Sequence, residues 1–170
     1  MDRPRDEPKR IDEADASGLT LRPATDADAP AVRELIFSVL AEFGLRPDPA
    51  TTDADLYAIE ATYAVPGGRF DVLVDRDGRV IGSVALWPVD GRTVELRKMY
   101  LSQAARGRGA GRLLLDHAIA RAREAGFTRM TLETARVLDG AVRLYERYGF
   151  RAYVPEHIAG RCDLAMEREI

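Results

Sequence analysis

The residues best suited to chemistry form a short loop, residues 106–111, which reads Arg-Gly-Arg-Gly-Ala-Gly and is followed by Arg112. A predicted strand ends before this loop and a predicted helix begins after it, so the glycines let the backbone turn without Cβ clashes. The first N–H groups of a helix have no partner inside it, and the helix dipole adds partial positive charge there. Such amides, with guanidinium groups around them, bind phosphate oxygens. The loop therefore predicts a diphosphate site made by Arg106, Gly107, Arg108, Gly109, Ala110, Gly111 and Arg112.

Three other interpretations of the loop are a dinucleotide-binding site, a Walker phosphate-binding loop and a purely structural turn. A dinucleotide-binding fold requires Gly-x-Gly-x-x-Gly after a strand of nearly all apolar residues. Here the spacing is Gly107-x-Gly109-x-Gly111 and the strand before it is charged, although Glu133 ends the next strand, where a ribose-binding acid could lie. A Walker loop fails because no Gly-Lys-Ser/Thr follows. A glycine-rich turn with solvated arginines remains the plain structural alternative.

Strands and helices are expected on both sides of the loop. Apolar residues at helical spacing predict helices, and alternating residues bounded by turns predict strands. The expected order is strand, two helices, three strands, helix, strand, helix and two strands, which gives a mixed α+β sheet with an antiparallel centre and one crossover after the loop. The strands are expected over residues 19–22, 70–74, 79–86, 94–101, 130–134, 150–154 and 163–167, and the helices over 32–43, 53–63, 112–125 and 138–148.

Composition limits the class of protein. The chain has 170 residues, 46% of them apolar and 31% charged, with a formal net charge of −3, which predicts one soluble globular domain and gives no reason to expect nucleic-acid binding. Apolar runs are too short to span a bilayer and the N-terminus lacks a signal core, so no membrane association and a cytoplasmic location are expected. Residues 1–18 are highly charged and predict a disordered tail before a domain over 19–170.

The single cysteine and the two histidines indicate no further chemistry. Cys162 can form no internal disulfide and has no neighbouring histidine or lysine that would make it a catalytic thiol. The histidines and the cysteine do not have the spacing of metal ligands, so no metal site is predicted.

Several segments taken in order resemble the GCN5-related N-acetyltransferase (GNAT) superfamily. Arg106-x-x-Gly109-x-Gly111 matches the family's pyrophosphate-binding signature Q/R-x-x-G-x-G/A. The resemblance extends over about residues 19–170 and implies the GNAT fold, with a splayed strand pair, and an enzyme that uses acetyl-CoA. The other matching segments are Leu21–Pro30, Asp77–Gly82, Glu95–Leu101, Ala141–Phe150 and Leu164–Glu169.

The resemblance also implies roles for single residues. Backbone groups of Met99 and Leu101 would contact the pantetheine arm, and an amide near Met99 would polarise the thioester carbonyl. Tyr145 matches a family tyrosine that gives a proton to the departing thiolate, and Glu95 lies where many members place the base that deprotonates the amine. From the two-residue strand period we expect Glu95, Arg97 and Met99 to share one face. The alternatives are that Tyr145 is a core residue and that Glu95 only pairs with Arg97.

One position departs from the family pattern. Family members often carry asparagine three residues before the alanine at position 141, whereas this chain has Leu138. That asparagine usually helps to hold the pantetheine or the local loop, so the geometry at the thiol end is open.

The acceptor is expected to be the primary amine of a small molecule or amino acid, with a protein amine as second choice. Arg97 could instead hold a carboxylate of an acidic acceptor. A non-catalytic acyl-CoA sensor or scaffold with the same fold is the alternative function. The family often forms homodimers, and nothing in the sequence identifies such a surface.

Overall fold

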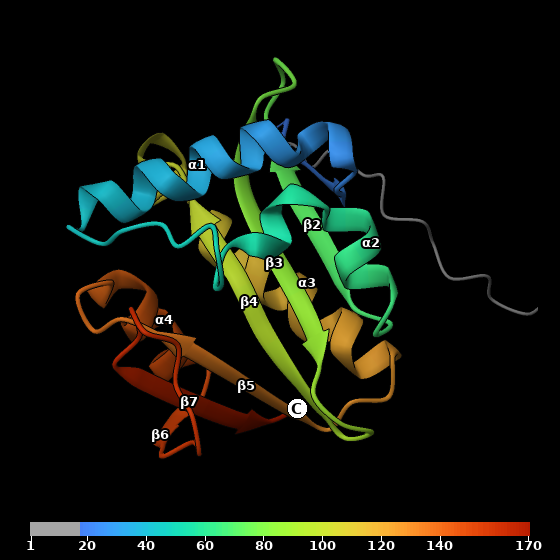
Figure 1. The fold of residues 1–170 in the computed structure, drawn as a ribbon, viewed down its shortest axis with the longest axis vertical. Helices are drawn as coiled ribbons and strands as arrows, with labels where there is room; N and C mark the ends of the chain where they lie inside the picture. Colours follow the sequence, from blue (N-terminus) through green and yellow to red (C-terminus); the bar gives the residue numbers. More distant parts are fainter. Residues whose placement is uncertain (1–17) are drawn as a thin grey trace, which may run out of the picture.

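The computed structural model describes residues 18–170, so the charged tail expected over residues 1–18 lies outside the described residues, Gly18 excepted. Seven strands form one sheet and helices cover both of its faces (Figure 1). The strands are β1 (Thr20–Pro23), β2 (Arg69–Val74), β3 (Val80–Pro88), β4 (Thr93–Leu101), β5 (Arg129–Thr134), β6 (Arg151–Tyr153) and β7 (Leu164–Glu169). The helices are α1 (Ala29–Glu42), α2 (Ile59–Ala64), α3 (Ala110–Glu124) and α4 (Asp139–Arg147), with short 3-10 turns η1 (Asp26–Asp28), η2 (Ala54–Tyr57) and η3 (Gln103–Ala105).

The sheet has the order β1-β2-β3-β4-β5-β7-β6. Every neighbouring pair within residues 18–170 is antiparallel except β4 and β5, which run parallel because α3 crosses over between them. The element order and the mixed, mostly antiparallel sheet confirm the predicted α+β fold.

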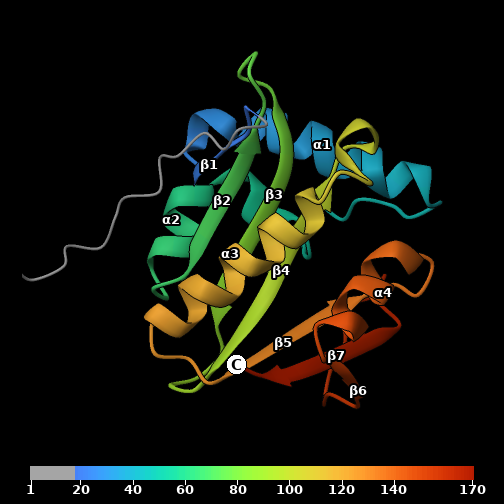
Figure 2. The ribbon, with the colours of Figure 1, turned by 180° about the vertical axis from the view of Figure 1, so that it is seen from behind.

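Two hydrophobic cores lie on the two faces of the sheet. Helices α1 and α2 cover one face in Figure 1, and α3 covers the other, as Figure 2 shows from behind. Burying a side chain of this size typically contributes about 1.5–3 kcal/mol, so the cores hold the helices in place. The α1 side buries Val32, Ile36, Leu40, Leu56 and Ile59, and the α3 side buries Leu114, Leu115, Met130 and Leu132.

Local sequence sets the start of α1. Thr25 and Asp28 form a capping box in which the Thr25 amide donates to Asp28 Oδ2 at 2.8 Å. Pro30 occupies the first turn, where its missing N–H costs little. Arg22 pairs with Asp28 through two 2.8 Å hydrogen bonds and so ties strand β1 to the helix start.

The helix expected over residues 53–63 is broken in two. Ala58 has φ −151° and ψ 69°, a non-helical conformation that ends η2 and precedes α2. Leu56 and Ile59 are both buried on either side of this break. A continuous helix was therefore the wrong prediction for this segment, and the break leaves Asp53 and Asp55 beside strand β4.

Candidate active site

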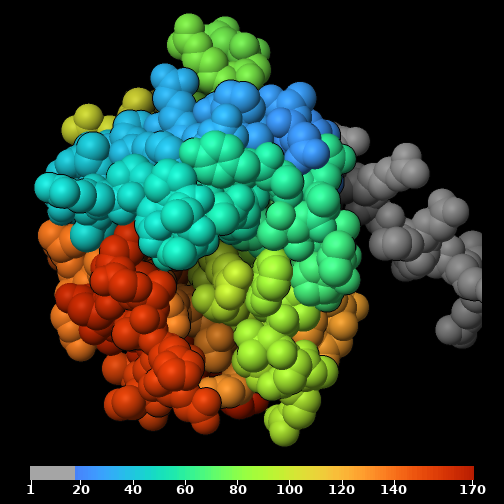
Figure 3. Space-filling view, in the orientation of Figure 1, coloured from blue at the N-terminus to red at the C-terminus, as the bar shows by residue number. Residues whose placement is uncertain are grey.

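The site lies where β4 and β5 separate. Residues Thr93–Leu96 of β4 pair with Arg129–Leu132 of β5. Within residues 18–170, no strand pairs with the same edge of β4 over residues 97–101. Two cavities adjoin this gap, one of about 500 Å³ and one of about 360 Å³. Figure 3 shows the surface hollowed between the C-terminal segment and strands β3 and β4.

The glycine loop follows β4 directly and has the conformation that its sequence predicts. Gly107 (φ 73°) and Gly109 (φ 83°) take left-handed backbone conformations, which L side chains rarely adopt. Gly109 is the N-cap residue of α3, and a Cβ at either glycine would meet nothing within 4 Å. At Gly111 a Cβ would lie 3.3 Å from Leu144 Cδ2, so this glycine serves close packing. The open space over the loop and the free amides at the start of α3 fit a diphosphate.

The predicted cofactor-binding residues, except Arg112, line one of two neighbouring cavities. Arg108, Gly109 and Ala110 line a neighbouring cavity of about 430 Å³ beside the β2–β3 hairpin, and Arg112 lies in the first turn of α3. The others line the 360 Å³ cavity, which we call the donor cavity: Met99, Leu101, Arg106, Gly107 and Gly111, together with Tyr145, Leu138 and Ala141.

Arg106 is already engaged by the protein. Its Nη1 donates to Glu42 Oε2 at 2.7 Å and its Nε to the Leu101 carbonyl at 3.1 Å, while its guanidinium lies 5.5 Å from the Phe43 ring centroid. These contacts join the end of α1 to the glycine loop. The role of Arg106 toward phosphate stays a prediction.

A β-bulge in β4 changes which side chains face the site. Ser83 pairs with Tyr100 and Ala85 with Arg97, so Lys98 and Met99 together face one residue of β3. Lys98 has a φ of 50°, and its carbonyl accepts a 2.6 Å hydrogen bond from Ser83 Oγ. The bulge places Arg97 and Lys98 on the same face and turns Met99 toward the core on the α3 side.

The expectation that Glu95, Arg97 and Met99 share a face is therefore wrong for Met99. Side chains alternate between the two faces of a sheet only where the ladder of paired residues is unbroken. The extra residue at Lys98 moves each following side chain of β4 to the opposite face. A signal was present in the sequence, because two successive charged residues interrupt the alternation of the strand.

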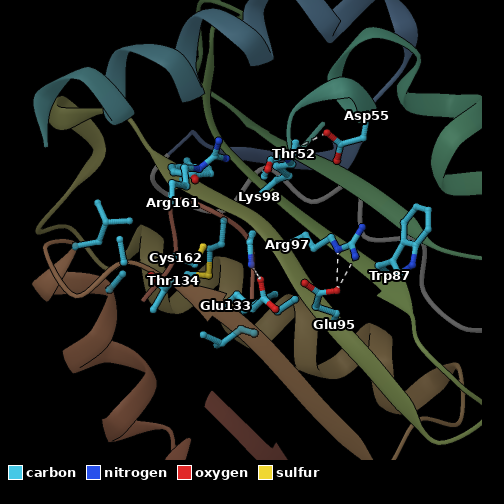
Figure 4. A pocket seen from close by; sticks show the side chains of 18 of the residues that line it. Thr52, Asp55, Trp87, Glu95, Arg97, Lys98, Glu133, Thr134, Arg161 and Cys162 are labelled. Carbon is cyan, nitrogen blue, oxygen red and sulfur yellow. Dashed lines mark hydrogen bonds and ion pairs between the residues drawn. The ribbon is translucent and has the colours of Figure 1, made fainter. Parts of the chain in front are cut away.

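Next to the bulge lies a buried ionic cluster that the sequence did not predict. We call Asp53, Asp55, Lys98 and Arg161 the Asp53 cluster. Asp53 is 0% exposed and accepts hydrogen bonds from Lys98 Nζ at 2.7 Å and from both Arg161 Nη atoms at 2.6 and 2.8 Å. Burial by itself would raise the pKa of Asp53, but hydrogen bonds from Arg161, from the Asp48 amide and from Lys98 lower it to about 2. Through Asp53 the cluster ties the segment before η2 and the β6–β7 loop to the bulge. Figure 4 labels its other three members, Asp55, Lys98 and Arg161.

Glu95 and Arg97 form an ion pair in the larger cavity. Arg97 Nε donates to Glu95 Oε2 at 2.9 Å, and Nη2 lies 2.7 Å from the same oxygen. The guanidinium lies 4.5 Å from the Trp87 ring centroid, a cation–π contact. Glu133 faces the same cavity from β5 and accepts a 2.9 Å hydrogen bond from the Ala159 amide. Figure 4 shows these carboxylates and Arg97 in one recess, which we call the acceptor cavity.

Tyr145 lines both cavities. It is 5% exposed, and its ring packs edge-on against Phe150 at 5.8 Å. Burial, with a smaller effect of Tyr100, raises the pKa of Tyr145, so its hydroxyl stays protonated at neutral pH. The nearby Tyr148 donates instead to Asp116 Oδ1 at 2.8 Å and lines neither cavity.

Cys162 also lines the acceptor cavity. Burial and the charge of Glu133 raise the pKa of its thiol to about 11, so it is protonated at neutral pH and is a poor nucleophile. Across residues 18–170, three or more His, Cys, Asp or Glu side chains nowhere gather in a metal-binding arrangement. In the same residues, no helix has both the length and the apolar character needed to cross a membrane.

Known proteins resemble this chain in sequence and in structure. The sequence pattern of the acetyltransferase (GNAT) family matches residues 34–150, more than half of the chain. This chain belongs to the GNAT family. The Escherichia coli protein named "uncharacterized N-acetyltransferase YjgM" is 37% identical to this GNAT enzyme over 163 residues, covering 88% of this chain and 94% of that protein. The predicted class, an acyl-CoA-dependent N-acetyltransferase, is therefore confirmed.

Solved structures agree on the fold. A GNAT-family acetyltransferase from Staphylococcus aureus superimposes with a TM-score of 0.83 at 23% identity, over 89% of this chain and 98% of that one. A phosphinothricin acetyltransferase from Sinorhizobium meliloti, solved in complex with acetyl-CoA, gives a TM-score of 0.69 at 24% identity, over 90% and 89% of the two chains. This GNAT enzyme shares the fold in which acetyl-CoA is bound in that neighbour.

Proposed function

We propose that this GNAT enzyme acetylates the primary amine of a small molecule held in the acceptor cavity. The observation that carries the proposal is that the donor and acceptor cavities meet at shared residues. Met99, Tyr100, Leu138, Ala141 and Tyr145 line both. A thioester in one cavity and an amine in the other would thus be adjacent at Tyr145, the geometry that a direct transfer requires.

The proposed roles follow from where the groups lie. Glu95 takes a proton from the acceptor ammonium, directly or through water, and the ion pair with Arg97 holds the Glu95 carboxylate in the cavity. The amine nitrogen then forms a bond to the thioester carbonyl carbon, and the tetrahedral intermediate collapses as the carbon–sulfur bond breaks, with the nitrogen's second proton released to solvent. A backbone amide near Met99 would stabilise the developing oxyanion. Tyr145, protonated and facing both cavities, gives its proton to the departing thiolate.

The charge of the acceptor cavity supports an amine as its ligand. Four carboxylates, of Asp53, Asp55, Glu95 and Glu133, lie in or beside it against three cations, of Arg97, Lys98 and Arg161. The ammonium group of an amine ligand pairs with this excess of carboxylates. The volume of about 500 Å³ lies in the range of small-molecule sites, roughly 300–1,000 Å³.

Release of free CoA thiol tests the proposal. The purified protein is incubated with acetyl-CoA and a panel of small amines, free amino acids and a peptide with a free N-terminus and a lysine. We expect turnover with at least one small amine or amino acid, and a fall in kcat/KM of roughly 100- to 10,000-fold in Glu95→Gln. Glu124→Gln, which changes a carboxylate on the exposed end of α3, is the matched control and keeps full activity.

Two results would contradict the proposal. Turnover of the peptide alone would move the acceptor to a protein amine. Acetyl-CoA binding without consumption across the whole panel would remove small amines as the acceptor class.

A further inference from the structure

We infer that the acceptor is an α-amino acid whose carboxylate is bound by Arg97. The inference rests on the proposed function, since it names the class of amine in the acceptor cavity. Three cationic side chains line that cavity: Arg97, Lys98 and Arg161. They differ in how many of their hydrogen-bond donors the protein already uses.

Lys98 and Arg161 are committed to the Asp53 cluster. Lys98 Nζ donates to the Thr52 carbonyl and to Asp53 Oδ1 at 2.7 Å each, and it forms an ion pair with Asp55 Oδ1 at 3.2 Å. Both Nη atoms of Arg161 donate to Asp53, a fork-to-fork pair. The side chains of Lys98 and Arg161 are 6% and 14% exposed. Releasing either to a ligand would leave Asp53 buried with its charge less compensated, so neither is a ligand site.

Arg97 differs on each of these points. Its side chain is 34% exposed and its contacts with Glu95 use one side of the guanidinium, through Nε and Nη2. Within residues 18–170, Nη1 has no hydrogen-bond partner and is not a buried unsatisfied atom. The guanidinium also lies over the Trp87 ring, 4.5 Å from the ring centroid. A planar, oriented guanidinium with a free edge suits the two oxygens of a carboxylate.

The contact between Glu95 and Arg97 fixes how far apart the ligand's charges can be. Glu95 Oε2 lies 2.7 Å from Arg97 Nη2, so groups that bind the two side chains must themselves be neighbours. In an α-amino acid the ammonium and the carboxylate are attached to one carbon. The ammonium then meets Glu95, which takes its proton, while the carboxylate meets the free edge of Arg97. A long ω-amino acid, whose charges are several bonds apart, does not match this spacing.

The test compares each amino acid with its own carboxamide, which keeps the amine and the side chain but loses the carboxylate. We measure kcat/KM for both across the standard amino acids, in the wild type, Arg97→Met and Arg97→Lys. In the wild type we expect the best acid to exceed its amide by on the order of 10- to 100-fold, because a charged hydrogen-bonded pair is lost. Arg97→Met reduces this ratio to about 1, and Arg97→Lys leaves an intermediate ratio.

The ratio of kcat/KM for an acid to kcat/KM for its amide measures recognition of the carboxylate separately from other effects on catalysis. Changing Arg97 also alters Glu95, but it does so for both substrates, so the effect cancels between acid and amide. Arg123→Met removes an exposed arginine of α3 that lines none of the described cavities, and it keeps the wild-type ratio. Circular dichroism and acetyl-CoA binding verify that each variant is folded.

The outcomes separate this inference from the proposed function. If wild-type enzyme acetylates amides and simple amines as well as it acetylates acids, the carboxylate inference is wrong and the small-amine function stands. The same holds if Arg97→Met keeps the wild-type ratio. If no small amine is acetylated, the proposed function fails and this inference fails with it. The comparison of acids with amides in the wild-type enzyme needs no variant. It can therefore still refute the inference if the Arg97 variants misfold.

Discussion

Replacing Asp53 by asparagine should destabilise the enzyme strongly at neutral pH. Asp53→Asn keeps the size of the side chain but removes the charge that faces Lys98 and Arg161, both nearly buried. Breaking a buried ion pair by removing one partner typically costs about 3–5 kcal/mol, because the other charge is left uncompensated. That cost is a large fraction of the roughly 5–15 kcal/mol by which domains are stable.

The same residue predicts a pH dependence with a definite sign. The pKa of Asp53 is about 2 in the folded protein against an ordinary value of 3.8. A carboxyl whose pKa is lowered by folding stabilises the protein above its unfolded pKa, and this stabilisation is lost as the pH falls through the folded value. The difference corresponds to roughly 2 kcal/mol, lost between about pH 4 and pH 2. Asp53→Asn has no such titration, so the gap between wild type and variant should narrow as the pH falls.

Urea unfolding followed by circular dichroism at pH 7 and at intervals down to pH 2 measures both effects. Asp139→Asn is the control, because it breaks an ion pair with Arg143 whose side chains are 65% and 64% exposed. An exposed pair of this kind contributes at most about 1 kcal/mol. If Asp53→Asn costs no more than Asp139→Asn at pH 7, or if its cost is the same at pH 7 and pH 2, our account of the cluster is refuted.

Three further predictions concern the reaction. Tyr145→Phe should lower kcat by about 100- to 10,000-fold with an unchanged Kd for acetyl-CoA, because it removes only the proton donor. Equal losses of kcat in Tyr145→Phe and Tyr148→Phe would contradict the role of Tyr145 as the proton donor. Gly109→Asp puts a side chain and a negative charge where φ is 83°, so calorimetry should detect no acetyl-CoA binding, and binding at wild-type strength would disprove the anion site. Cys162, with a pKa of about 11, should react slowly with iodoacetamide at pH 7 and faster as the pH approaches 11. Rapid reaction at pH 7 would contradict the raised pKa. Cys162→Ala should keep its acetyltransferase activity.

The sequence predicts the fold well because its signals are local. Apolar periodicity, glycine turns and the Thr25–Asp28 cap depend on residues close to one another, and the elements follow in the predicted order. The glycine loop is equally readable, because left-handed φ at Gly107 and Gly109 is a property of glycine itself.

The acceptor side depends on contacts between distant residues, and there the sequence is less informative. Asp53 and Arg161 are 108 positions apart, and neither has a local reason to be buried. The bulge at Lys98 depends on the pairing of β4 with β3, and in the sequence only the successive charges of Arg97 and Lys98 indicate it. The same bulge overturns the predicted orientation of Met99. The catalytic roles of Glu95 and Tyr145 stay predictions.

The core on the α3 side joins both halves of the sheet, and the short ladder between β4 and β5 leaves an edge where a bound ligand should add to their cohesion. In the part of the chain that the structure describes, four residue pairs join the two halves of the sheet there, and no strand lies on the β5 side of β4 over residues 97–101. A ligand seated along that edge bridges both halves, and a ligand that binds only the folded state adds about 2.7 kcal/mol to its stability at 100 times Kd. The empty enzyme is thus the form most exposed to unfolding and proteolysis. The lifetime of the protein in a cell should therefore follow the supply of acetyl-CoA.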